Sequence, residues 1–335
     1  MEHSMTNTYT FDLHDNVTRT SVRFKNRYGI ELAGDLYQPK NTNGKLAALP
    51  VSGAFGAVKE QTSGFYANEL ASRGFVALAF DNAFTGESGG EVRNVASPDI
   101  FTEDFSAAVD FLGGLDIVDR NRIGVMAICG LSGMAITAAI NDKRIKAVAT
   151  ASMYDMSRSI SKGYADSYSL ADRNKIRDYL AAQRWADVDA GNFATGPHEI
   201  TFDENGDVLV TQGLPEIIPD FLKDNPVLTA FHNYYKTERG YHKRSVNSTG
   251  AWTATTPQAF FNFPLVTNVE EMDRPMLLIA GENAHSRYYS EDVAKAAGDI
   301  AELVIVPNAD HVDLYDKVEK IPFDQLVSFF NQALS

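Results

Sequence analysis

The sequence predicts an α/β fold, in which helices cover both faces of a mostly parallel central sheet and a helical cap is inserted into the chain. Short apolar runs with the composition of buried strands recur along the sequence. Stretches with apolar residues at helical spacing separate these runs, so we expect consecutive strands to be joined by helices and to run parallel. The alternation stops once, between residues 156 and 271. An interruption of this length is too long for a loop in a compact domain and indicates an inserted unit.

The first part of the chain alternates strands with helices from residue 16 onward. The run Phe75–Phe80 is apolar throughout, which is typical of a strand covered on both faces. Phe101, Phe105 and Leu112 recur at helical spacing and predict an amphipathic helix. The predicted elements are, in order, two strands within 16–39, a strand at 46–51, a helix at 62–73, a strand at 75–80 and a helix at 99–114.

The same alternation continues on both sides of the interruption. The predicted elements there are a strand at 122–128, a helix at 133–141, strands at 145–152 and 275–282, a helix near 289–298, a strand at 302–307 and a helix at 322–334. We therefore expect a core domain built from residues 1–155 and 272–335. Residues 156–271 are interpreted as a mostly helical cap, or lid, inserted between two strands of that core.

The composition excludes several classes of protein. Hydrophobic residues make up 44% of the chain and charged residues 22%, which is ordinary for a globular protein. No apolar run approaches the roughly 18 residues of a membrane span, and the polar N-terminus lacks the pattern of a signal or transit peptide. The net charge of −14 argues against nucleic acid as a partner. We expect a soluble, cytoplasmic protein with neither nucleic-acid nor membrane partners.

The chain has a single cysteine, Cys129, which excludes a disulfide framework and a cysteine-rich metal site. It lies in RIGVMAICGLSG, a predicted strand, turn and helix. A nucleophile at such an elbow sits on a strained turn, and the next backbone N–H points to where an oxyanion develops. Either Cys129 or Ser132 could occupy the elbow. We favour Cys129, because the alternative register with Ser132 makes the preceding strand too long.

His311 lies in VPNADHVDLYD, directly after the last predicted apolar strand and before the last helix. A histidine in that loop is placed to act as the base that takes a proton from the nucleophile. The other histidines have no comparable position, although His285 follows a strand and is placed to line a pocket.

Together these segments resemble the α/β-hydrolases of the dienelactone-hydrolase-like branch, with a cysteine in place of serine at the elbow. They also resemble the related group that contains fungal polyketide-chain transferases. The segments that carry the resemblance are VSGAFGAVKEQ, FVALAFDNAFTGESGG, RIGVMAICGLSGM, LLIAGENAHSR and VPNADHVDLYD, in that order. The resemblance implies that the backbone N–H groups of Gly130 and Phe55 form the oxyanion hole. Lys59 and Glu60, near the expected mouth of the site, are interpreted as solvated surface residues.

The resemblance leaves the third catalytic residue open. The family's acid position, three residues after Gly281, holds Ala284. Asp155, which follows the strand at 145–152, and Glu282 are two substitutes, and the third alternative is that no acid is present. A missing acid is tolerable beside a thiol, because cysteine and histidine can form a thiolate–imidazolium pair that lowers the pKa of the thiol.

The implied enzyme is a hydrolase of an ester, thioester or lactone. Cys129 attacks the acyl carbonyl, His311 takes the thiol proton and later activates water, and no cofactor or metal is required. The aromatic-rich insertion predicts an apolar or aromatic acyl compound as the small-molecule substrate. Two alternatives stay open, an acyltransferase that uses the same site and a catalytically silent fold that binds a ligand. The insertion is interpreted as a roof over Cys129 or, alternatively, as an outward-facing element of a homodimer.

Overall fold

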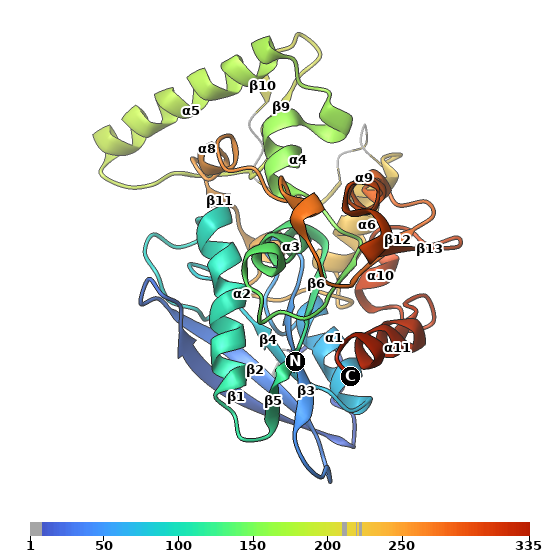
Figure 1. Ribbon diagram of the computed structural model, residues 1–335. Coiled ribbons are helices and arrows are strands. Elements are labelled where there is room, and N and C mark those ends of the chain that lie inside the picture. The colour runs from blue at the N-terminus through green and yellow to red at the C-terminus, as the bar shows by residue number, and fades with distance from the viewer. Residues whose placement is uncertain (1–8, 210–212, 219, 221–222) are drawn as a thin grey trace, which may run out of the picture.

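The computed structural model describes residues 9–209, 213–218, 220 and 223–335. Its centre is a nine-stranded sheet with the order β1-β2-β4-β3-β6-β7-β12-β13, in which β5 also pairs with β3 (Figure 1). These strands are β1 Val17–Lys25, β2 Glu31–Pro39, β3 Leu46–Ser52, β4 Val76–Phe80, β5 Val118–Ile123, β6 Val125–Ile128, β7 Val148–Ala151, β12 Met276–Gly281 and β13 Ala301–Val306.

The sheet is antiparallel only at one side, where β1 pairs with β2 and β2 with β4. From β4 to β13 all pairs are parallel. The carboxyl ends of these parallel strands share one edge, where the loops after β3, β6, β7, β12 and β13 meet. Ligands bind at this edge in open α/β sheets, so the topology assembles the predicted site residues there. The predicted fold class is confirmed.

Helices cover both faces of the sheet. The flanking helices are α1 Thr62–Ser72, α2 Pro98–Gly113, α3 Ser132–Asn141, α9 Arg287–Ala297, α10 Asp313–Asp316 and α11 Phe323–Ala333. The alternation of side chains along β12 shows the two layers: Leu278 belongs to the apolar cluster that includes side chains of α2, α3 and α9, whereas Leu277 and Ile279 belong to the cluster that includes side chains of α1 and α11. No helix within the described ranges is both long and apolar enough to cross a membrane.

One predicted strand differs from the structure. The sequence indicated a single strand at 122–128, whereas β5 and β6 are separate strands divided at Gly124. The backbone is packed tightly at that point, since a Cβ on Gly124 would lie 3.1 Å from the carbonyl oxygen of Ala147 and 2.9 Å from the ring of Phe330.

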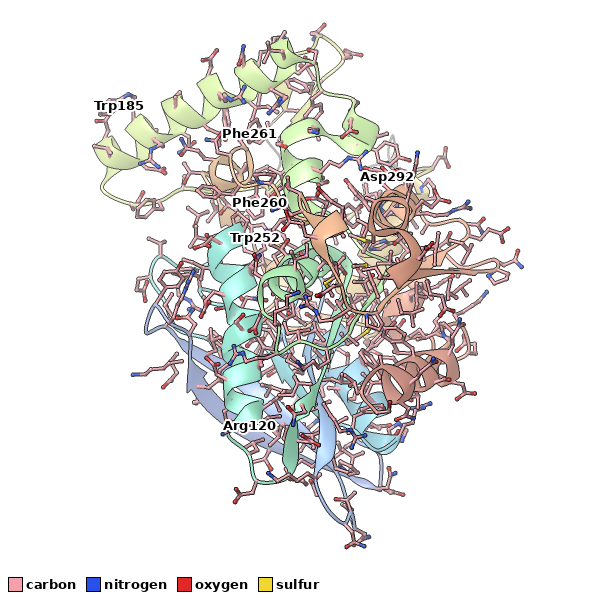
Figure 2. All side chains as sticks on the ribbon, in the orientation of Figure 1. Arg120, Trp185, Trp252, Phe260, Phe261 and Asp292 are labelled. Carbon is pink, nitrogen blue, oxygen red and sulfur yellow. The ribbon has the colours of Figure 1, made fainter. Side chains whose placement is uncertain are left out.

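The insertion combines helices with short strands, and fewer than half of its described residues are helical. Its elements are α4 Met156–Lys162, α5 Leu170–Ala190, α6 Pro226–Tyr235, α7 Val246–Thr249 and α8 Pro257–Phe260, with the short strands β8 Thr195–Gly196, β9 Thr201–Phe202, β10 Val208–Leu209 and β11 Trp252–Thr253. The helix α5 begins at a capping box formed by Ser169 and Asp172 and ends at Gly191 in the left-handed conformation. Figure 1 shows α5 at the top of the molecule, away from the sheet. Trp185, near its outer end, is 71% exposed (Figure 2).

Candidate active site

Cys129 sits at the carboxyl end of β6, at the turn into α3. Its φ of 57° lies in the left-handed region, which is strained for a residue with a Cβ and typical of a nucleophile elbow. The turn leaves no space beside it, since a Cβ on Gly130 would lie 2.5 Å from the Cβ of Phe55. Cys129 lines a cavity of about 680 Å³. The structure therefore places Cys129 where a nucleophile would meet a ligand.

Ser132, the alternative nucleophile, is the first residue of α3 and is fully buried. Its hydroxyl donates to the carbonyl oxygen of Ala127 at 3.3 Å, back along β6. It is not among the described residues that line the cavity. The geometry at the turn therefore fits Cys129, and not Ser132, at the position of the elbow nucleophile.

His311 lies in the loop between β13 and α10 and is only 2% exposed. Its Nε2 atom is 3.3 Å from the sulfur of Cys129 and 3.1 Å from the hydroxyl of Tyr315. Its Nδ1 atom is 2.6 Å from the Oγ of Ser286. The fold brings Cys129 and His311, far apart in the chain, within hydrogen-bond reach of each other.

Ser286 occupies the position beside His311 for which the sequence offered two carboxylates. Asp155 instead caps α4, where it accepts a hydrogen bond from a backbone N–H at 3.0 Å. Glu282 accepts a hydrogen bond from the backbone N–H of Asn308 at 2.9 Å. Neither carboxylate hydrogen-bonds His311 in the described structure. In this structure a neutral hydroxyl, that of Ser286, contacts Nδ1 of His311 in place of either carboxylate.

The backbone N–H groups of Gly130 and Phe55 both lower the pKa of the Cys129 thiol, which identifies them as donors directed toward its sulfur. Gly130 follows the elbow, and Phe55 comes from the loop after β3. The carbonyl oxygen of Phe55 accepts a hydrogen bond from Nδ2 of Asn247 at 2.7 Å, and its ring stacks on Trp252 with centroids 4.4 Å apart. The two donors converge beside the sulfur, where the oxyanion of a tetrahedral intermediate would lie.

Burial keeps the Cys129–His311 pair neutral. Desolvation raises the pKa of the Cys129 thiol to about 11, and the hydrogen bonds from Tyr315, Gly130 and Phe55 offset this only in part. Burial, followed by repulsion from His285, holds the pKa of His311 well below its usual range. Both shifts favour a thiol beside a neutral imidazole over the thiolate–imidazolium pair.

A cavity of about 680 Å³ opens above Cys129, and most of the residues that line it belong to the insertion. The ring of Phe231, on α6, lies 5.4 Å from the ring of His311. Trp252 and His285 also line the cavity, the latter as expected from its position after a strand. In the described part of the chain, no three His, Cys, Asp or Glu side chains are grouped so that they could hold a metal ion.

Sequence reasoning missed two residues of this site, Tyr315 and Ser286. Tyr315 follows His311 by four residues, a spacing that brings side chains together on a helical turn and could have indicated it. Ser286 lies in LLIAGENAHSR, where a serine differs from the carboxylate that the family usually places beside the histidine.

Comparison with known proteins gives matches over nearly the whole chain. A model of the family described as "PETase: PET hydrolase-like" matches residues 11–172. The chain is 52% identical to the uncharacterized protein PA2218 of Pseudomonas aeruginosa, over 97% of this chain and 83% of that protein. It is 30% identical to the uncharacterized protein YcjY of Escherichia coli, over 94% of this chain and 99% of that protein. It is also 33% identical to the thiohydrolase AneE of Aspergillus aculeatus, over 40% of this chain and 42% of that protein.

Solved structures show the same architecture. The crystal structure of PA2218 matches with a TM-score of 0.88 at 50% identity and covers 99% of both chains. The α/β hydrolase GrgF from a Penicillium species matches with a TM-score of 0.73 at 17% identity, over 95% of this chain and 99% of that one, which is a likeness of fold. The sheet, the elbow and these similarities together show that the chain belongs to the α/β-hydrolase superfamily, in one family with PA2218 and YcjY.

Proposed function

We propose that this α/β-hydrolase cleaves an ester or thioester of an apolar acyl compound through an acyl-enzyme on Cys129. The observation that carries the proposal is the convergence on one sulfur atom of a base, His311 Nε2 at 3.3 Å, and of two backbone N–H donors. A nucleophile, a base and oxyanion donors are the groups that acyl transfer needs. The similarity to a thiohydrolase supports the same class of reaction.

Acylation follows from the neutral resting pair. The imidazole of His311 carries its proton on Nδ1 and donates a hydrogen bond from there to the hydroxyl of Ser286, so Nε2 accepts a hydrogen bond from the thiol. As the sulfur attacks the carbonyl carbon, the thiol proton moves to Nε2. The N–H groups of Gly130 and Phe55 hold the oxyanion, and one such donor contributes about 10²–10³-fold to the rate in comparable enzymes. His311 then protonates the leaving alcohol or thiol as its bond to carbon breaks, which leaves a thioester on Cys129.

Deacylation reverses these proton movements. Water attacks the thioester carbon and gives a proton to His311 Nε2, and the sulfur leaves when the intermediate collapses. The hydroxyl of Tyr315 hydrogen-bonds the charged sulfur and stabilises it as the leaving group. The proton on His311 returns to the sulfur, and the free acid departs.

The same acyl-enzyme supports transfer to an alcohol or amine, and one observation favours this second reaction. Cys129 is 7% exposed and His311 2% exposed, beneath a cavity lined mainly by the insertion. At the base of such a cavity, a bound substrate would shield the acyl-enzyme from bulk water. An acceptor that enters the cavity would take the acyl group by the same proton transfers.

The proposal is tested with thioesters of medium-chain acids, with thiol release followed optically and the protein followed by mass spectrometry. We expect an acyl adduct on Cys129, and loss of both adduct and turnover in Cys129→Ala. Ser132→Ala is the matched control and should keep both. An adduct on Ser132, or full activity of Cys129→Ala, would refute the mechanism. Repeating the reaction with a primary alcohol or amine separates transfer from hydrolysis by the product formed.

A further inference from the structure

Glu199 is the only residue with a formal charge at neutral pH among the described residues that line the cavity. We infer that it binds a protonated amine carried by the acyl substrate. This inference rests on the proposed function and names a substrate class for the same site.

The charge balance of the cavity supports a cationic ligand. The described lining contains no lysine, arginine or aspartate. Its two histidines are held neutral, since burial lowers the pKa of His285 to about 4 and also lowers that of His198. Glu199 forms no ion pair with any described basic side chain. The cavity therefore carries one uncompensated negative charge, which a cation would neutralise and a carboxylate would oppose.

The carboxylate itself is tethered but not satisfied. The hydroxyl of Ser159, on α4, donates to Oε1 of Glu199. No described donor reaches Oε2. A neutral hydroxyl orients the carboxylate without compensating its charge, so a charge-assisted hydrogen bond from a ligand remains available.

Aromatic rings connect this carboxylate to the reacting centre. His198 precedes Glu199, and its ring lies 5.3 Å from the ring of Phe55 and 6.4 Å from that of Trp252. Aromatic faces attract cations and pack against methylene groups. Phe55 also supplies an N–H of the oxyanion hole, so this residue contacts both the reacting centre and the aromatic rings that lead toward Glu199. A substrate with its carbonyl at Phe55 N–H and its amine at Glu199 would span these rings with its carbon chain.

Binding to Cys129→Ala tests the inference without catalysis, because the probes and the variant cannot react. Isothermal titration compares n-hexylammonium, hexanol and hexanoate. We expect hexylammonium to bind about tenfold or more tightly than hexanoate, as a charge-assisted hydrogen bond is typically worth that factor. Adding Glu199→Gln should abolish the difference, since glutamine keeps the bond from Ser159 but removes the charge. Glu204→Gln, the same change at an exposed position beyond β9, is the matched control and should keep it.

Kinetics then connect the binding site with the reaction. The kcat/KM values of the enzyme are compared for thioesters of 6-aminohexanoic, heptanoic and adipic acids. We expect kcat/KM for the amino substrate to exceed kcat/KM for the carboxylate substrate by about tenfold or more, and Glu199→Gln to lose this ratio.

Equal binding of hexylammonium and hexanoate, or a kcat/KM ratio that Glu199→Gln leaves intact, would overturn the inference. Turnover that survives Cys129→Ala would instead refute the proposed function while the binding result stands. If Glu199→Gln lowers the Tm, Ser159→Ala breaks the same tether but keeps the charge, and it must retain the ammonium preference.

Discussion

At the scale of single residues, the hydroxyl of Ser286 stands where an acid usually orients the histidine. Ser286→Ala would leave the buried Nδ1–H of His311 without its partner at 2.6 Å. An unsatisfied buried donor costs about 1–3 kcal/mol, so we expect kcat/KM to fall by about tenfold to a hundredfold. Steady-state kinetics on a thioester measure this, and the Tm of the variant shows whether the fold is intact.

The two carboxylates provide the controls for Ser286. Asp155→Ala removes the cap of α4 and should lower the free energy of unfolding by about 1 kcal/mol, while kcat/KM stays within about twofold. Glu282→Gln should leave kcat/KM unchanged. A loss of activity in either variant as large as that of Ser286→Ala would mean that a carboxylate supports His311 in solution.

The reactivity of Cys129 should depend on pH as that of a buried thiol. Iodoacetamide reacts with the thiolate, and burial raises the pKa of Cys129 to about 11. Because the thiolate fraction rises tenfold per pH unit below the pKa, we expect the native rate to rise in that proportion from about pH 7 to 10. In urea the same thiol should level off above about pH 9, near its unperturbed pKa of about 8.5. The chain has one cysteine, so mass spectrometry reports this site alone.

Tyr315→Phe tests how the Tyr315 hydroxyl contributes to the pKa of Cys129. The Tyr315 hydroxyl lowers the pKa of Cys129, so its removal should slow alkylation further at every pH below 10. A native rate that is already level below pH 8 would contradict the neutral pair and restore the thiolate–imidazolium form.

At the scale of elements, the loop between β3 and α1 is fixed by charges that the fold buries. The backbone N–H of Lys59 donates to Asp81 at 2.7 Å, and its ammonium group binds Glu87 at 2.7 Å. Glu60 pairs with Lys59 and with Arg244 of the insertion. Lys59 and Glu60 are each 2% exposed, so their interpretation as solvated surface residues is wrong. Buried charges persist when they are paired, and these pairs hold the loop that presents Phe55.

The insertion also contacts this loop directly at Phe55. Asn247→Ala would remove the 2.7 Å hydrogen bond to the carbonyl oxygen of Phe55 and loosen its N–H as an oxyanion donor. One such bond is worth about 0.5–1.5 kcal/mol, so we expect kcat/KM to fall about threefold to tenfold, mainly through kcat. Iodoacetamide alkylation of Cys129 should fall less than kcat/KM, because alkylation forms no oxyanion and responds only to the effect of the Phe55 N–H on the pKa of the thiol. Asn233→Ala, exposed on α6, is the matched control. A parallel loss of alkylation would indicate general disorder of the site instead.

These elements show what the sequence could and could not predict. The strands and helices of the core follow from local apolar periodicity, and the elbow and His311 follow from their places at strand ends. Pairings between distant segments do not follow, because no local pattern encodes that Arg244 reaches Glu60 or that Ser286 reaches His311. The direction in which the pKa of Cys129 is shifted could not be predicted either, because it depends on how deeply the folded chain buries the sulfur.

At the scale of the whole molecule, the insertion joins the core in two different ways. Tyr234 and Tyr235 of α6 are buried in the same apolar cluster as Tyr315, and the hydroxyl of Tyr234 lies 3.0 Å from that of Thr62. By contrast, the buried apolar side chains of α5 are Ile176 and Leu180, and they form a small separate cluster with Ile200. The two parts should therefore differ in local stability, because little apolar surface holds α5 in place.

Hydrogen exchange followed by mass spectrometry tests this difference. We expect amides of α5 to exchange well before those of α6 and α3, since local opening of α5 exposes only its small cluster. Ile176→Ala should speed exchange in α5 alone. The cavity left by the substitution would lower the free energy of local opening of α5 by about 2–5 kcal/mol. Leu170→Ala, at a 67% exposed position of the same helix, should change nothing. The homodimer stays a prediction, and the experiment also addresses it. Burial of Trp185 in a dimer would make the protection of α5 rise with protein concentration. If α5 and α6 exchange together, and Ile176→Ala loosens both, the insertion opens as a single unit and the distinction between its two parts fails.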